Sequence, residues 1–139
     1  MGRINMGRVL LGGLAAGVVI NFGEFLLNEK VIAADMNAFL AKMGLQPPGG
    51  SAIGWFVLFG FGLGIVVTWL YAAIRPRFGS GPKTAVCAGL VTWLLCAVYP
   101  SAFFLVLGMM PAGSLITGMV WELVEIPLAA VVGAWLYRE

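Results

Sequence analysis

The sequence predicts an all-α polytopic membrane protein with four transmembrane helices and an outer amphipathic helix between the first two. Two features of the composition predict this class: hydrophobic residues make up 61% of the 139 residues, and charged residues only 10%. Soluble domains carry roughly 25% charged residues. The third observation is that four apolar runs are each long enough to cross a hydrocarbon layer of about 30 Å. The length is that of one domain, residues 1–139.

The first apolar run covers residues 9–27 and follows two basic residues, Arg3 and Arg8. A basic stretch before an apolar run is also typical of a cleaved signal peptide. The length of the run and the three apolar runs that follow it favour a helix that stays in the membrane.

Residues 30–44 form the long polar-containing connection between the first two runs. Apolar residues recur in it at helical spacing, while Asp35 and Lys42 fall on other faces, so it predicts an amphipathic helix that ends near Gly44. Its charges nearly cancel, which favours a helix held in the membrane interface by apolar contact. The alternative is that this segment continues the first helix and packs on a neighbour.

The second span, residues 53–74, contains Gly60 and Gly64 at the spacing that lets two helix backbones approach closely. Gly13 and Gly17 repeat this spacing in the first run. We expect all four glycines to pack helices against one another.

The third and fourth spans, residues 84–107 and 114–136, each contain a proline. Proline lacks the amide N–H that a helix interior needs. We expect Pro100 to kink the third helix, and Pro127 to leave the Leu123 carbonyl without its helical partner.

The basic residues predict the orientation of the spans. Only Lys30 and Lys42 lie in the connection between the first two spans, whereas the other six flank the opposite ends of the apolar runs: Arg3, Arg8, Arg75, Arg77, Lys83 and Arg138. Because short cytoplasmic segments are enriched in Lys and Arg, we expect both termini and the 75–83 loop to face the cytoplasm. The loop lacks the GxxxxGK[ST] pattern of a phosphate-binding loop. The sequence also lacks a basic helix of the kind that binds nucleic acid.

Three carboxylates fall inside the spans and mark the candidate site, because ionisable groups at that depth are costly and usually functional. Glu122 and Glu125 are three residues apart on one face of the fourth helix, near mid-membrane. We expect the pair to share a proton and to titrate as a coupled unit. Glu24 lies nearer the outer end of the first helix, where a carboxylate can also be simply interfacial.

Other chemistries are less well supported. Four-helix carboxylate cages for iron use Glu-x-x-His pairs, and the chain has no His. If the set Glu24, Glu122, Glu125 and Asn21 held a metal at all, its oxygen atoms would suit a hard cation such as Ca²⁺ or Mg²⁺. We expect no metal, no cofactor, no catalytic residue and no enzymatic activity, since no nucleophile–base pair is visible. A plain alternative is that protonated glutamates join helices by bonding to Thr68, Thr92, Trp69 or Trp93.

Two stretches, Tyr71–Gly79 with Gly81–Thr84 and Glu125–Ala130 with Gly133–Glu139, resemble segments of small four-helix bacterial inner-membrane proteins. The resemblance covers about the last half of the chain. It implies a bacterial inner-membrane (plasma-membrane) location, with no activity attached.

The sequence thus predicts a non-enzymatic accessory or interaction subunit in the lipid bilayer, working as a homo-oligomer or within a membrane complex. The alternative is a proton- or cation-coupled transporter or channel unit, with Glu122 and Glu125 as the exchange site and Glu24 as its outer gate. A cavity that joins these residues favours transport, whereas a dry face bonded to threonines favours a purely structural role.

Overall fold

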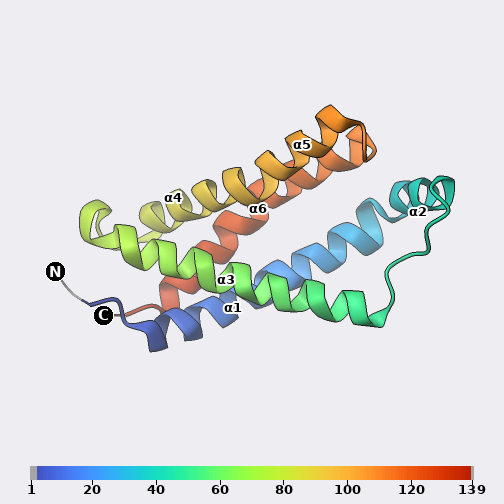
Figure 1. The fold of residues 1–139 in the computed structure, drawn as a ribbon. Helices are drawn as coiled ribbons and strands as arrows, with labels where there is room; N and C mark the ends of the chain where they lie inside the picture. The colour runs from blue at the N-terminus through green and yellow to red at the C-terminus, as the bar shows by residue number, and fades with distance from the viewer. Residues whose placement is uncertain (1–2, 139) are drawn as a thin grey trace.

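The structure, a computed structural model, describes residues 3–138, and within that range the chain is helical with no strand (Figure 1). Two segments, η1 and η2, are π-helical and continue the helices before them. In chain order the elements are α1 (Met6–Leu26), η1 (Leu27–Val31), α2 (Ala33–Lys42), α3 (Gly50–Phe78), α4 (Pro82–Trp93), η2 (Leu94–Val98), α5 (Tyr99–Leu107) and α6 (Ala112–Leu136).

Within residues 3–138, four continuous helices are long and apolar enough to cross a membrane: Met6–Val31, Gly50–Phe78, Pro82–Leu107 and Ala112–Leu136. The predicted all-helical class, with four helices able to span a membrane, is confirmed. Each helix begins two or three residues earlier than the apolar runs indicate. The extra turns come from polar caps and turn residues: the Asn5 side chain accepts a hydrogen bond from the Arg8 amide, and Pro82 occupies the first turn of α4.

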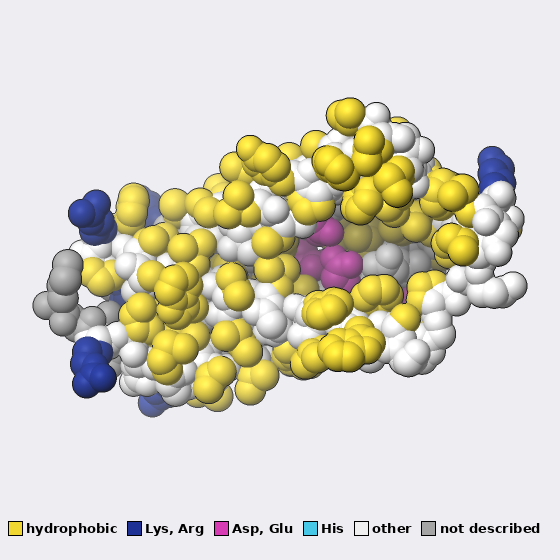
Figure 2. All heavy atoms as spheres, in the orientation of Figure 1, with side chains coloured by type: hydrophobic (Ala, Val, Ile, Leu, Met, Phe, Trp, Pro, Cys, Tyr) yellow, Lys and Arg dark blue, Asp and Glu magenta, His cyan; other side chains and the backbone are white. Residues whose placement is uncertain are grey.

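The helices bring both chain ends and the α3–α4 turn together at one end of the molecule, with α2 and the α5–α6 turn at the other (Figure 1). We call these the basic end and the α2 end, because most Lys and Arg side chains gather at the first (Figure 2). Helix α1 packs against both α3 and α6, and α4 packs against α6. The apolar core lies toward the basic end, where Val9, Ala16, Val67, Ala88 and Ala129 are fully buried.

Glycines allow α1 and α3 to approach closely. A Cβ added at Gly13 would lie 2.6 Å from the Ile65 Cα, and one added at Gly64 would lie 2.8 Å from the Gly17 Cα. A Cβ added at Gly60 would collide with the Asn21 side chain. These glycines therefore pack helices of one chain, where nothing larger fits.

A glycine also allows α4 and α6 to approach closely. A Cβ at Gly89 would lie 2.5 Å from the Cα of Pro127, which is itself buried. Pro100 stands in the first turn of α5, directly after the π-helical η2, in which the Tyr99 amide bonds back to the Leu94 carbonyl. Both prolines thus lie within continuous helices.

Aromatic contacts close the basic end. Tyr71 and Tyr137 meet edge to face, with ring centroids 6.0 Å apart, and the Arg75 guanidinium lies 5.5 Å from the centre of the Tyr137 ring. The Tyr137 hydroxyl accepts from the Asn5 amide, and the Tyr71 hydroxyl accepts from the Gly81 amide, each at 3.3 Å. The start of α1, the end of α3 and the chain end after α6 are tied together here.

The connection between α1 and α3 differs from the single helix expected over residues 30–44. The first helix continues through η1 to Val31 and breaks at Ile32, whose φ and ψ are −108° and 1°. Helix α2 then runs only from Ala33 to Lys42, and none of its residues is buried. Gly44, with φ of 69°, turns the chain away toward α3.

Candidate functional site

The structure brings the three membrane-embedded carboxyls together. Because α1 runs toward the α2 end and α6 runs away from it, the late position of Glu24 on α1 meets the middle positions of Glu122 and Glu125 on α6. Glu24 and Glu122 line the same cavity, and Gly23, next to Glu24, packs on the Glu125 carboxyl. Figure 2 shows the acidic side chains in a hollow on one long face, between α1 and α3 on one side and α4 to α6 on the other.

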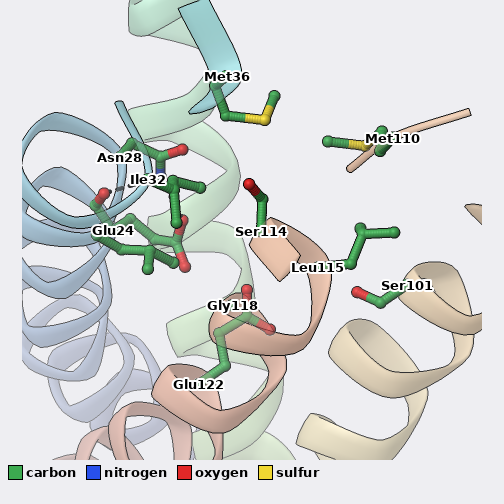
Figure 3. Close-up of a pocket in the computed structure, with 11 residues that line it drawn as sticks. Glu24, Asn28, Ile32, Met36, Ser101, Met110, Ser114, Leu115, Gly118 and Glu122 are labelled. Atoms are coloured by element: carbon green, nitrogen blue, oxygen red, sulfur yellow. Dashed lines mark hydrogen bonds between the residues drawn. The ribbon is translucent and has the colours of Figure 1, made fainter. Parts of the chain in front are cut away.

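A cavity of about 130 Å³ lies above the carboxyls, toward the α2 end. This is space for several water molecules. Its polar lining comes from Glu24, Asn28, Ser101, Ser114 and Glu122, and its apolar lining from Leu27, Ile32, Met36, Met110 and Leu115, with Gly118 completing the wall. Figure 3 shows the two carboxyls on facing helices and the two methionines nearer α2. No basic side chain lines this cavity among the residues that the structure describes.

Glu24 is held by a neighbour on its own helix. The Asn28 side-chain amide donates to the Glu24 Oε2 at 3.1 Å and to the Glu24 backbone carbonyl at 2.8 Å. Asn28 belongs to the π-helical η1, so the π-helical register helps to set where its side chain meets the Glu24 carboxyl. The outer carboxyl is thus fixed at the cavity wall.

Glu125 is the most buried of the three, with only 6% of its surface exposed. Its Oε2 accepts a 2.7 Å hydrogen bond from the Trp121 indole N–H, one turn earlier on α6. Its Oε1 is buried and has no hydrogen-bond partner within residues 3–138. The carboxyl packs directly on Gly23 of α1, where any side chain would collide with it. A glycine next to Glu24 therefore makes room for the third carboxyl.

Asn21, which the sequence groups with the three carboxyls, makes its side-chain hydrogen bonds elsewhere. Its side-chain amide donates to the carbonyls of Gly17 at 2.9 Å and Val57 at 3.2 Å. Asn21 therefore faces α3, whereas Glu24, one turn later, faces α6.

Three of the groups expected to bond the glutamates, Thr68, Thr92 and Trp93, donate to backbone carbonyls instead. The hydroxyls of Thr68 and Thr92 donate to carbonyls of their own helices, each at 2.9 Å, and the Trp93 indole donates to the Met119 carbonyl at 2.8 Å. None of these groups bonds a carboxyl. The face is not a dry one bonded to threonines; it adjoins a cavity that reaches Glu24.

The cluster can hold positive charge without chelating a metal. Within the described part of the chain, no group of three or more Asp, Glu, Cys or His has metal-binding geometry. Neighbouring carboxyls in a low dielectric do not all stay ionised on their own. Either some of them hold a proton, or a bound cation balances their charge. Such a group of carboxyls can take up protons or a neutralising cation.

Sequence reasoning missed the groups that surround the carboxyls: Asn28, Trp121, Ser114 and Gly23. Two of them carry a usable signal, since Asn28 is four residues after Glu24 and Trp121 is four residues before Glu125, which places each pair on one helix face. Ser114 and Gly23 become recognisable only once α1 and α6 are placed side by side. Comparison of the chain with protein-family models, curated proteins and solved structures finds no match.

Proposed function

We propose that this protein is a small transporter or channel unit that binds and exchanges protons or a monovalent cation through Glu24, Glu122 and Glu125. The observation that carries the proposal is the cavity that joins Glu122 to Glu24, with Glu125 buried directly behind them. Membrane carboxyls that line a water-sized space mark ion and proton pathways. The absence of a basic side chain from the described lining leaves their charge to a mobile ion.

The proposed orientation places the α2 end outside a bacterial inner membrane and both termini in the cytoplasm. The distribution of Lys and Arg supports it, through the excess of positive charge on cytoplasmic segments. In this orientation α2 lies at the outer interface, with Met36 toward the cavity. Cations then reach Glu24 and Glu122 from outside first.

The site is closed toward the basic end. Beyond Glu125, toward the basic end, the helices are in close contact through glycine and alanine, with no exposed surface at Ala16, Ala88 or Ala129. Release toward the cytoplasm requires these contacts to separate. The mechanism we propose is therefore exchange from the outer cavity, followed by a shift of α1 and α3 against α6.

The role of an accessory subunit within a homo-oligomer stays a prediction. The small residues that suggest an oligomer are used largely inside the chain, between α1 and α3 and between α4 and α6. The site needs no second copy to bring its carboxyls together.

Proton movement in liposomes tests the proposal. The full chain is reconstituted with a pH-sensitive dye in the lumen, under an imposed membrane potential in one arm and a Na⁺ or K⁺ gradient in the other. We expect protein-dependent proton movement in at least one arm, and its reduction to the rate of protein-free liposomes in Glu122→Gln and Glu125→Gln. The control Glu29→Gln, which changes an exposed acid outside the cavity, should keep the wild-type rate. Wild-type rates equal to protein-free liposomes in both arms would overturn the proposal.

A further inference from the structure

We infer that the cavity beside Glu24 and Glu122 binds a primary alkylammonium ion, with the –NH₃⁺ group at the carboxyls and the alkyl chain between the apolar walls. This inference deepens the proposed function by naming the class of cation, and it rests on that function. Three observations support it: the polar atoms that line the cavity, the absence of a hydrogen-bond partner for one of them, and the apolar side chains around them.

The base of the cavity offers hydrogen-bond acceptors. Glu24 and Glu122 face each other from α1 and α6, and the hydroxyls of Ser101 and Ser114 complete the polar lining (Figure 3). The donors of Asn28 are already used by Glu24. A group with several N–H donors and a full positive charge matches this arrangement, and –NH₃⁺ has three such donors.

Ser114 gives the independent evidence that a ligand belongs here. Its side chain is 4% exposed, and its hydroxyl oxygen is buried without a hydrogen-bond partner in the described chain. Figure 3 shows this hydroxyl pointing into the space between Met36 and Glu24. A buried hydroxyl without a partner is costly, so a donor or acceptor from outside the protein is expected beside it.

The rest of the wall is apolar and non-aromatic. Five aliphatic or thioether side chains line it: Leu27, Ile32, Met36, Met110 and Leu115. Sites for quaternary ammonium groups are built from aromatic rings, and none occurs in this lining as the structure describes it. Methionine side chains adapt to chains of different length, which suits an alkyl tail.

Other occupants fit less well. A hydrated inorganic ion gains nothing from apolar walls, and the acidic residues have no metal-binding geometry within the described range. The headgroup ammonium of an ethanolamine lipid has the same chemistry, but its phosphate would lie beside a cavity whose described lining has no cation to receive it. A free amine therefore fits this cavity best.

Calorimetric titration of the detergent-purified full chain with n-alkylammonium chlorides, from methyl to hexyl, tests the inference. Each buried CH₂ should tighten binding roughly fourfold, the ratio expected for transfer of one methylene out of water. Hexyltrimethylammonium, with the same tail but no N–H donor, should bind at least about tenfold more weakly than hexylammonium. An affinity that changes neither with the length of the alkyl chain nor with loss of the N–H donors would overturn the inference.

Matched variants connect the binding to the cavity. Ser114→Ala should weaken hexylammonium about tenfold through loss of one hydrogen-bond partner, whereas Ser51→Ala, on the exposed start of α3, should not change it. Should Ser114→Ala fail to fold, Met36→Ala replaces it and should flatten the dependence on chain length. Hexylammonium binding that is unchanged in Glu122→Gln would contradict the assignment.

The source of the ammonium is decided in nanodiscs. Hexylammonium binding that is equal with and without phosphatidylethanolamine supports a free amine, whereas competition by phosphatidylethanolamine overturns that source in favour of the lipid headgroup. Absence of any alkylammonium binding, while the liposomes still show Glu122-dependent proton movement, overturns this inference and leaves the proposed function standing. Loss of both results overturns both.

Discussion

A single hydrogen bond holds the most buried acid of the site. Glu125 has one oxygen bonded to the Trp121 indole and one without a partner in the described chain. Removing the indole donor leaves both oxygens buried without a partner. A buried polar group in that state costs about 1–3 kcal/mol, more when it is charged.

Trp121→Phe should therefore lower the free energy of unfolding by about 1–3 kcal/mol. The change keeps an aromatic ring and removes the N–H group. Trp135→Phe, on the same helix and with 79% of the side chain exposed, is the matched control and should be near neutral. Unfolding of the detergent-solubilised variants by increasing SDS measures both. Equal stability of the two variants would show that the bond to Glu125 contributes nothing.

At this scale the sequence predicts which residues are unusual but not what supports them. Glu24, Glu122 and Glu125 are recognisable because a carboxyl within an apolar run is costly and is therefore usually retained for a function. Asn21 is only one turn away from Glu24 on the same helix, yet its side chain bonds to α3. Helix α1 packs between α3 and α6, so neighbouring positions on its surface face different helices.

The helices themselves follow from the length of the apolar runs, and their ends follow from polar residues beyond those runs. The π-helical η1 and η2 could not be predicted, because a π register wins only when tertiary contacts favour it. Glycine spacing predicts the close approach of α1 and α3 without showing which glycines face lipid.

The α1–α3 contact gives a prediction for a pair of neighbouring glycines. A side chain at Gly64 would meet the backbone of α1, whereas one at Gly62 has nothing within 4 Å. Gly64→Leu should destabilise the protein by at least about 1–3 kcal/mol through overpacking, and Gly62→Leu should be neutral or slightly stabilising. Thermal unfolding in detergent compares them. Similar melting temperatures for the two variants would mean that α1 and α3 do not meet as described.

The whole molecule is asymmetric along its length. The basic end is closed by the core and by the Tyr71–Tyr137 contact, whereas the α2 end holds the cavity and the carboxyls. The amino-acid pattern predicts that both ends of the chain lie on one side, because the basic residues alternate between the ends of the spans. The cavity could not be predicted, since it depends on how α1, α5 and α6 diverge.

The central claim is that water reaches the carboxyl site from the α2 end and not from the basic end. Gly118 lines the cavity and has room for a side chain, since an added Cβ would meet only the Leu27 Cδ2, at 4.0 Å. Gly62 also has room but opens away from the protein, toward lipid. Cysteine at each position, in a background with Cys87 and Cys96 replaced by alanine, makes a matched pair.

Sidedness of labelling by a membrane-impermeant, positively charged thiol reagent is the most direct test. In oriented membrane vesicles, Gly118→Cys should react when the reagent is outside and not when it is only on the cytoplasmic side. Gly62→Cys should react from neither side. Labelling of Gly118→Cys from the cytoplasmic side, or no labelling from either side, would contradict an outward-open carboxyl site.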